Sequence, residues 1–378
     1  MSDTDPNNDG AQVIIPENSL EQHTLIVPSR TQVAAPSTTS VHRKDSIIAG
    51  VVAVLVTGVV VGGSIATWQA PASTEAMVVA PYVVVEPPTP PQEPDPYESV
   101  ALRAQSAIVY DLATGAVLYE QHAETVRPLA SLTKVMTGLI AYEEADPNMQ
   151  VVITPYAIET EGDSGLLVHE RWRLRDLISF LMITSSNDGA EAVAASVGSL
   201  LTSTPSVKTE YELVDTFVDR MNTRATEIGL TQTRFRNPTG LDEPGNRHGG
   251  EGTAKDMALL LAYVWENAPD TVNDTILNDR VFTSSDGFIH RANNTNIYVG
   301  TKPGLLASKT GYTDDAGGNL GIVYDAGMGH PVVIVVLGST PTQRFTDVAH
   351  LIDATNAYIT SGWYEYDYII AGSTPVLR

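Results

Sequence analysis

Residues 47–68 contain no charged side chain, and they divide the chain into parts that must fold in different surroundings. The 22 residues IIAGVVAVLVTGVVVGGSIATW are long enough as a helix to cross a hydrocarbon layer of ~30 Å. Arg43 and Lys44 lie within four residues before them, whereas the first basic residue after them is Arg103. Because basic residues favour the cytoplasmic side, the sequence predicts a single transmembrane helix over residues 46–68, with the N-terminus in the cytoplasm and the remaining chain outside the cell membrane.

Two other interpretations of this apolar stretch are disfavoured by its length and its flanking residues. A buried helix of a soluble domain would need packing partners, and the flanking sequences offer none. A cleaved signal peptide would use Ala70-Pro71-Ala72 as a weak small-residue site, but the leader of about 45 residues and the apolar stretch are both longer than such signals. A retained span is the main prediction, and cleavage stays as the alternative.

The segments on either side of the span differ from the rest of the chain. Residues 1–45 show no sustained apolar period, which predicts a disordered cytoplasmic tail. Residues 69–97 contain eight prolines and end in PPTPPQEPDPY, which is typical of an extended linker. The folded domain is therefore expected over residues 98–378.

Charge and cysteine content exclude several kinds of function. The chain has 22 Lys and Arg against 45 Asp and Glu, a net charge of −23, which argues against nucleic acid as a partner. It has no cysteine, so disulfides, thiolate metal sites and thiol nucleophiles are excluded. Any covalent catalysis must then use serine, threonine or lysine as the nucleophile.

The order of predicted elements indicates an α+β domain. Alternating runs at 107–111 and 116–120, separated by a glycine-containing turn, predict a hairpin at the start, and a second antiparallel pair is expected near the end. Strands at both ends with helices between them favour an antiparallel sheet flanked by helices, together with an all-α subdomain. The helices are expected at 132–144, 174–182, 189–201, 211–228, 255–266 and 346–359, and the late strands at 319–324 and 331–337.

Ser131-Leu132-Thr133-Lys134 pairs a hydroxyl with an amine. At a helix start, residues i and i+3 lie on one face, so the Lys134 amine can reach the Ser131 hydroxyl one turn back. A lysine with its ordinary pKa near 10.4 is a poor base at neutral pH, so this one needs burial or a cationic neighbour. The pattern alone is weak, since S-x-x-K is expected about once by chance in a chain of this length.

Two further short motifs strengthen the case for a catalytic site. Ser185-Ser186-Asn187 follows an apolar helix and precedes another, which places a hydroxyl and a carboxamide on a short interhelical loop. Lys309-Thr310-Gly311 is expected just before the late strand pair, where the glycine lets another backbone approach closely. Each pattern occurs once in the sequence.

In this order the three motifs resemble the S-x-x-K, S-x-N and K-T-G set of the penicillin-recognising serine enzymes. The chain is most similar to the D-alanyl-D-alanine carboxypeptidases, the low-molecular-mass penicillin-binding proteins, and the resemblance extends from about residue 106 to residue 359. It implies a β-lactamase/transpeptidase-like fold and removal of the terminal D-Ala from peptidoglycan stem peptides that end in D-Ala-D-Ala. It also implies β-lactam antibiotics as covalent inhibitors and no cofactor.

The resemblance implies a role for each motif residue. Ser131 is expected to form the acyl-enzyme with Lys134 as its general base, and Ser185 to relay the proton to the leaving amine. Asn187 is expected to hold a substrate amide, and Lys309 to add positive charge beside Ser185.

The substrate carboxylate and the oxyanion involve further residues. Thr310 of the K-T-G motif, with Gly311 beside it, and Arg344 in the stretch PTQRFTD are expected to bind the terminal carboxylate. The backbone N–H groups of Ser131 and Tyr312 are expected to form the oxyanion hole. Asp242, in the sequence GLD, matches a family position and is either a supporting residue or a turn former.

Other functions within and outside this superfamily remain as alternatives. A D,D-endopeptidase or transpeptidase would use the same residues. A class A-like β-lactamase is disfavoured because GLTQTRFRNPTGLDE contains no E-x-x-L-N pattern, and a catalytically idle wall-binding scaffold is disfavoured because the motif residues are all present. No metal site is predicted: the eight histidines lack H-E-x-x-H spacing, and Asp314-Asp315 lacks the alternating ligands of a calcium loop.

Overall fold

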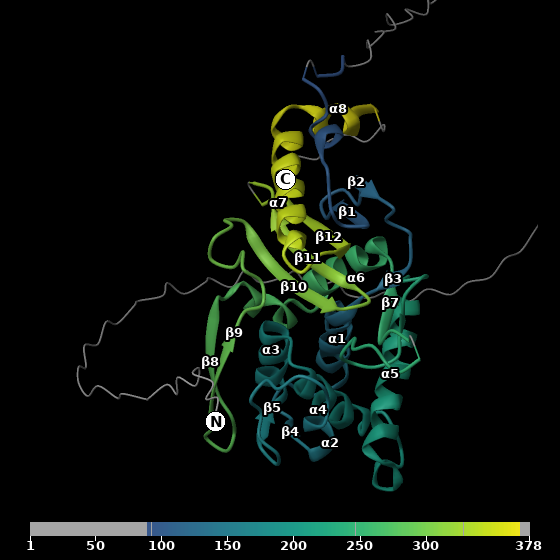
Figure 1. Cartoon of the computed structure of the whole chain (residues 1–378), viewed down its shortest axis with the longest axis vertical. Coiled ribbons are helices and arrows are strands. Elements are labelled where there is room, and N and C mark those ends of the chain that lie inside the picture. Colours follow the sequence, from purple (N-terminus) through teal and green to yellow (C-terminus); the bar gives the residue numbers. More distant parts are fainter. Residues whose placement is uncertain (1–88, 92, 246, 328, 371–378) are drawn as a thin grey trace, which may run out of the picture. The chain divides into compact units, whose positions relative to one another are not determined.

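The computed structural model describes residues 89–91, 93–245, 247–327 and 329–370 (Figure 1). The predicted tail and transmembrane helix, and most of the predicted linker, lie outside these residues. Within the described ranges, no helix combines the length and the apolar character needed to cross a membrane.

A five-stranded antiparallel sheet organises the fold, with the strand order β10-β11-β12-β1-β2. β1 pairs with β12, and Ser106 lies opposite Leu337. The strands that come first and last along the chain are therefore neighbours in the interior of the sheet. This confirms the predicted α+β class and the predicted contact between early and late strands. The strands are β1 (Ser106–Asp111), β2 (Val117–Gln121), β10 (Leu305–Thr313), β11 (Gly317–Asp325) and β12 (Pro331–Ser339).

Helices cover both faces of this sheet (Figure 1). Alternate side chains of β12 enter two different clusters: Ile334 packs on the side of α7 (Gln343–Thr360), whereas Val335 belongs to the core that includes α6 (Ala254–Asn267). Side chains of a strand point alternately to opposite faces, so a continuous apolar run such as that of β12 is buried on both. The short helices η1 (Pro96–Ser99) and α8 (Trp363–Ile370) pack against α7.

A mainly helical subdomain lies beside the sheet and shares its core (Figure 1). Trp172 is completely buried there and packs against the rings of Phe180 and Phe282. The all-α prediction is wrong in one detail, because a two-stranded ribbon, β4 and β5, precedes the second long helix. The subdomain contains α1 (Lys134–Glu144), β4 (Gln150–Val152), α2 (Pro155–Ile158), β5 (Arg171–Arg173), α3 (Leu174–Thr184), α4 (Asn187–Gly198), η3 (Pro205–Val207) and α5 (Glu210–Glu227).

Short elements connect these two parts of the fold. Strands of two or three residues form a small sheet that includes the segment just before Ser131, and a hairpin of two strands, β8 and β9, leads toward β10. The connecting elements are β3 (Arg127–Pro128), η2 (Ala130–Thr133), β6 (Arg234–Phe235), β7 (Gly250–Gly252), η4 (Pro269–Thr271), η5 (Asn273–Ile276), β8 (Asp279–Thr283) and β9 (Ile289–Asn293).

The predicted helices are found with their ends shifted by up to three residues. Besides several short elements such as β4 and β5, the elements that were not predicted include the β8–β9 hairpin, helix α8 and strand β10. Lys309-Thr310-Gly311 was expected just before the late strand pair but lies inside β10, an edge strand. The sequence LLASKTGYT shows no apolar alternation because its polar side chains Ser308, Lys309 and Thr310 are buried, and this hides the strand.

Candidate active site

Ser131 is half-buried in the 3₁₀ turn η2, which comes directly before α1. The turn begins at Ala130, which has φ +48°, a left-handed conformation uncommon for residues other than glycine. Gly240 encloses the turn from outside, because a Cβ at that position would lie 1.9 Å from the carbonyl oxygen of Ala130. The serine is therefore presented by a strained turn that the neighbouring loop holds tightly.

Asn319 of β11 ties this turn to the central sheet. Its Nδ2 donates to the carbonyl oxygens of Pro128 and Leu129, each at 3.0 Å, and its Oδ1 accepts from the N–H of Gly338 at 2.8 Å. The side chain is completely buried. Since a buried carboxamide is costly unless it is hydrogen-bonded, these contacts fix the segment that leads into Ser131.

The Lys134 amine contacts three other residues of the site. Nζ lies 2.9 Å from Ser131 Oγ, 2.6 Å from Asn187 Oδ1 and 2.7 Å from the carbonyl oxygen of Thr239. Lys134 is fully buried, and burial lowers its pKa to about 7, although the charges of Glu191 and Asp188 act in the opposite direction. The low pKa that the sequence required for a base is therefore explained by desolvation.

Ser185 and Asn187 occupy the junction between α3 and α4. Ser185 ends α3 with φ +64°, and Ser186 is the N-cap of α4, where its Oγ accepts from the N–H of Gly189. Asn187 is the first residue of α4 and donates from Nδ2 to the carbonyl oxygen of Glu161 at 2.7 Å. The predicted interhelical loop is thus only two residues long, and it holds both side chains in fixed directions.

β10 brings Lys309 to the same junction. Its Nζ donates to Ser185 Oγ at 2.8 Å and to the carbonyl oxygen of Thr310 at 2.9 Å. Lys309 is 1% exposed, and burial lowers its pKa well below the ordinary lysine value, with the positive charges of Lys134 and Arg344 adding to the shift.

Gly311 is the point at which β10 passes against the turn that holds Ser131. A Cβ at this position would lie 2.9 Å from the carbonyl oxygen of Leu129 and 3.2 Å from the backbone nitrogens of Ser131 and Leu132. Only glycine leaves room for this approach. The sequence-based expectation that Gly311 allows a close backbone contact agrees with this geometry.

The remaining predicted residues lie along β10 and at the start of α7. The Thr310 hydroxyl is 2.6 Å from the hydroxyl of Thr295, and Arg344 Nη1 donates to the carbonyl oxygen of Gly311 at 2.6 Å. Tyr312 directs its side chain outward: it is 48% exposed, and its hydroxyl donates to Asp314 at 2.7 Å. Arg344 is half-buried beside β10, so it is not a surface charge.

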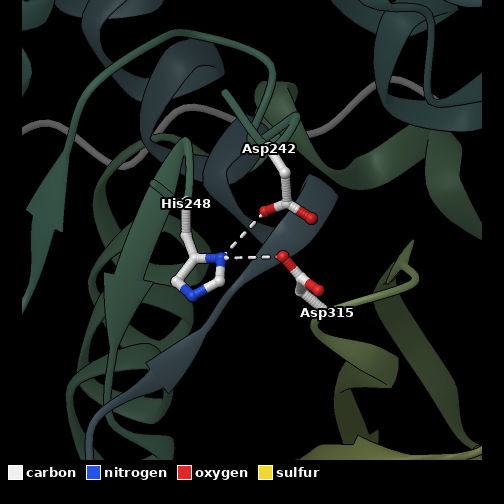
Figure 2. Close-up of side chains that lie close together, drawn as sticks. All are labelled: Asp242, His248 and Asp315. Atoms are coloured by element: carbon white, nitrogen blue, oxygen red, sulfur yellow. Dashed lines mark hydrogen bonds and ion pairs between the residues drawn. The ribbon is translucent and has the colours of Figure 1, made fainter. Parts of the chain in front are cut away.

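Asp242 does not contact the predicted catalytic side chains directly. Figure 2 shows it facing His248 and Asp315: His248 Nδ1 lies 3.0 Å from Asp242 Oδ1 and 3.8 Å from Asp315 Oδ2. Within the described residues these three ligand atoms lie within 4.8 Å of one another, a spacing that could hold a cation, and the histidine already bridges the two carboxylates. The group joins the loop after Gly240 to the β10–β11 turn, a contact that sequence spacing could not indicate.

A family model described as D-alanyl-D-alanine carboxypeptidase matches residues 91–341 of the chain. The chain belongs to the D-alanyl-D-alanine carboxypeptidase family. The match covers all three motifs and the five strands of the central sheet. It confirms the family inferred from the three motifs and the predicted enzyme class, a serine-type hydrolase.

Individual members of the carboxypeptidase family agree with this assignment. The carboxypeptidase DacF of Bacillus subtilis is 29% identical over 72% of this chain and 67% of its own length. A D-alanyl-D-alanine endopeptidase of Pseudomonas aeruginosa is 29% identical over 67% of this chain and 76% of its own length. The structure of a D-alanyl-D-alanine carboxypeptidase from Mycobacterium tuberculosis H37Rv superposes with a TM-score of 0.59 at 27% identity, covering 71% of this chain and 96% of that one. This structural similarity confirms the predicted fold class.

Some residues of the site could not be found from the motifs. Thr239 contributes only a backbone carbonyl, which leaves no pattern of side chains in the sequence. Asn319 is a polar residue in a mainly apolar strand, and nothing in the sequence indicates its role. Glu191, one helical turn after Asn187, is buried and acts on Lys134 through its charge. Glu191 could have been predicted to lie near the site, because it follows Asn187 by four residues and therefore shares a helix face with it.

Proposed function

We propose that the chain removes the terminal D-Ala from peptidoglycan stem peptides through an acyl-enzyme on Ser131. The observation that carries this proposal is the set of three contacts around Lys134 Nζ. A neutral amine has two N–H donors and one lone pair. The two donors match the oxygens of Asn187 and Thr239, so the lone pair faces the Ser131 hydroxyl.

Acylation then follows from this geometry. Ser131 Oγ attacks the carbonyl carbon of the penultimate D-Ala while its proton passes to Lys134 Nζ. The bond from that carbon to the nitrogen of the terminal D-Ala breaks, and Ser185 relays a proton to the departing amine. Water then hydrolyses the ester and returns the proton to Ser131.

Positive charge and hydrogen-bond donors surround the position of the substrate carboxylate. Lys309 contacts Ser185, and Arg344 lies against the backbone of β10 at Gly311, so two cations border the strand that carries Thr310. We assign the terminal carboxylate to Thr310 with Arg344 nearby, a substrate amide to Asn187, and the oxyanion to the N–H groups of Ser131 and Tyr312. The close passage of Gly311 against Ser131 supports this last assignment.

The same acyl-enzyme would be blocked by β-lactam antibiotics, which we propose as covalent inhibitors. We also propose that residues 46–68 anchor the chain in the cell membrane with the catalytic domain outside, a single-pass arrangement supported by the uncharged stretch 47–68 and by Arg43 and Lys44 before it. Residues 1–45 would then be a cytoplasmic tail, residues 69–97 a linker and residues 98–378 the catalytic domain.

A D,D-endopeptidase is the second candidate activity, because an endopeptidase of Pseudomonas aeruginosa is as similar in sequence as DacF. Both activities use the same nucleophile and differ in the peptide that the groove accepts.

The test incubates the purified chain with a stem pentapeptide and, separately, with a cross-linked peptide dimer. We expect release of free D-Ala from the pentapeptide and no cleavage of the dimer, and we expect Ser131→Ala to abolish the release. Cleavage of the dimer alone would assign the endopeptidase instead, and activity retained in Ser131→Ala would refute the acyl-enzyme on Ser131.

A further inference from the structure

Glu191 is a buried carboxyl group to which the reaction described above gives no role. It lies on α4, four residues after Asn187, and is 8% exposed. Residues i and i+4 of a helix share a face, so Glu191 lies on the side of α4 that carries the Lys134 contact. No described residue lies within hydrogen-bond distance of its buried Oε2. A carboxylate in this state is costly unless a nearby charge compensates for its burial.

The surroundings of the nucleophile contain three basic side chains whose described hydrogen bonds all go to neutral groups. Lys134 contacts two side chains and a carbonyl, Lys309 contacts Ser185 and a carbonyl, and Arg344 contacts a carbonyl. When Lys134 takes the proton of Ser131, it becomes an ammonium beside two other basic side chains, Lys309 and Arg344. A negative charge nearby stabilises this protonated state.

The charges of two carboxylates on α4, Asp188 and Glu191, act to raise the pKa of Lys134. They differ in their hydrogen bonds. Asp188 Oδ1 is shared by the hydroxyls of Ser186 and Ser164 and by the N–H of Gly189, so it is committed to the start of the helix. Glu191 has an unpartnered oxygen among the described residues. Burial raises the pKa of Glu191 to about 7, while the charge of Lys134 acts to lower it, which couples the two groups.

We propose that Glu191 is a positioning residue that supplies the counter-charge for the protonated Lys134 formed when Ser131 attacks its substrate. This inference rests on the proposed function of Ser131 and Lys134. The proton moves from Ser131 Oγ to Lys134 Nζ, and the negative charge of Glu191 stabilises the resulting ammonium without contacting the substrate. Its effect is to make Lys134 a stronger base than burial alone would allow.

The titratable groups around Lys134 and Glu191 belong to several elements packed together. Lys134 on α1 faces Glu191 and Asp188 on α4 and Lys309 on β10. Glu191 also acts on the hydroxyl of Tyr156 on α2. Asp215 on α5 acts on Tyr156 as well, but it is not among the charges that act on Lys134, which makes it a matched control.

The sign of the effect follows from the charges. An opposite charge nearby favours the protonated lysine, so removing Glu191 lowers the pKa of Lys134. The acidic limb of the acylation rate, which reports the deprotonation of Lys134 in the free enzyme, then moves to lower pH by about one unit. Above this limb the weaker base acylates roughly three- to tenfold more slowly.

The experiment measures the second-order rate of acylation by a fluorescent penicillin from pH 5 to pH 10, with the full-length chain. We expect Glu191→Gln to shift the acidic limb downward, and Glu191→Asp and Asp215→Asn to leave it close to that of the unmodified chain. If Glu191→Gln does not fold, Glu191→Met removes the charge without leaving a polar group to satisfy, and it gives the same measurement.

The outcomes separate this inference from the proposed function. An unshifted limb in a folded Glu191→Gln or Glu191→Met chain, whatever the rate, would show that Glu191 acts only structurally and would overturn the inference. Absence of any acylation of Ser131 in the unmodified chain would instead refute the proposed function, and this inference with it.

Discussion

Replacing Gly311 with alanine tests whether the close passage of β10 controls the nucleophile. The added Cβ would lie 2.9 Å from the carbonyl oxygen of Leu129 and 3.2 Å from the backbone nitrogen of Ser131. Both neighbours are backbone atoms, and Asn319 ties the segment before Ser131 to the sheet. Because that segment cannot yield, the edge strand β10 must move.

The size of the displacement sets the expected effect. Ordinary contact begins at 3.4 Å, so β10 moves away by about 0.5 Å, taking Lys309 and Thr310 with it. A misplacement of about 1 Å can lower a rate by roughly a hundredfold, so we expect acylation to fall about tenfold. Overpacking of this kind costs about 1 kcal/mol, which lowers Tm by about 2–4 °C in a domain of this size.

The assay compares acylation by a fluorescent penicillin and thermal unfolding in Gly311→Ala and Gly321→Ala. At Gly321 the added Cβ would meet Leu261 Cδ1 at 2.6 Å, the end of a flexible side chain on the α6 side of the sheet. We expect this control to lose a similar amount of stability while its acylation rate changes less than about twofold. An unchanged rate in Gly311→Ala would refute the argument that β10 positions the site through this contact.

Three further outcomes follow from the structure. Because burial lowers the pKa of Lys134 to about 7 and a base must be deprotonated, the acylation rate should rise with pH through about 7; a rate that is constant from pH 5 to pH 9 would contradict this role. Asn319→Ala removes the three hydrogen bonds of a buried carboxamide and should lower the free energy of unfolding by about 2–4 kcal/mol in urea titrations. Trp172→Ala should lower the free energy of unfolding by about 3–5 kcal/mol in the same titrations. The folded fraction should acylate at the normal rate, because the rings that Trp172 packs against, Phe180, Phe282 and His290, are not site residues.

Much of the fold was accessible from the sequence because its helices and late strands follow simple apolar periods. The run PVVIVVLGS of β12 is buried on both faces, and it was predicted as a strand. β10 was missed because its buried residues are the polar ones that the site requires, so a functional requirement replaced the usual apolar pattern. The β8–β9 hairpin was missed for a different reason. Its apolar residues Val281 and Ile289 are largely exposed, so the hairpin shows no pattern of buried apolar side chains.

The site was predictable wherever a motif places two groups within one turn. Ser131 and Lys134 were expected to meet through helical spacing, and they lie 2.9 Å apart. The contact between Lys309 and Ser185 joins residues 124 positions apart in the sequence, and its prediction came from the family resemblance alone. The carbonyl of Thr239 could come from neither source, because a backbone contact between distant segments leaves no pattern in the side chains.

The central claim is that Ser131 is the acylated nucleophile. Incubation with benzylpenicillin followed by mass spectrometry of the intact chain and of its proteolytic peptides tests this directly. We predict one adduct with the mass of the whole antibiotic, located on Ser131 and absent from Ser131→Ala. An unmodified chain, or an adduct that persists in Ser131→Ala, would contradict the account.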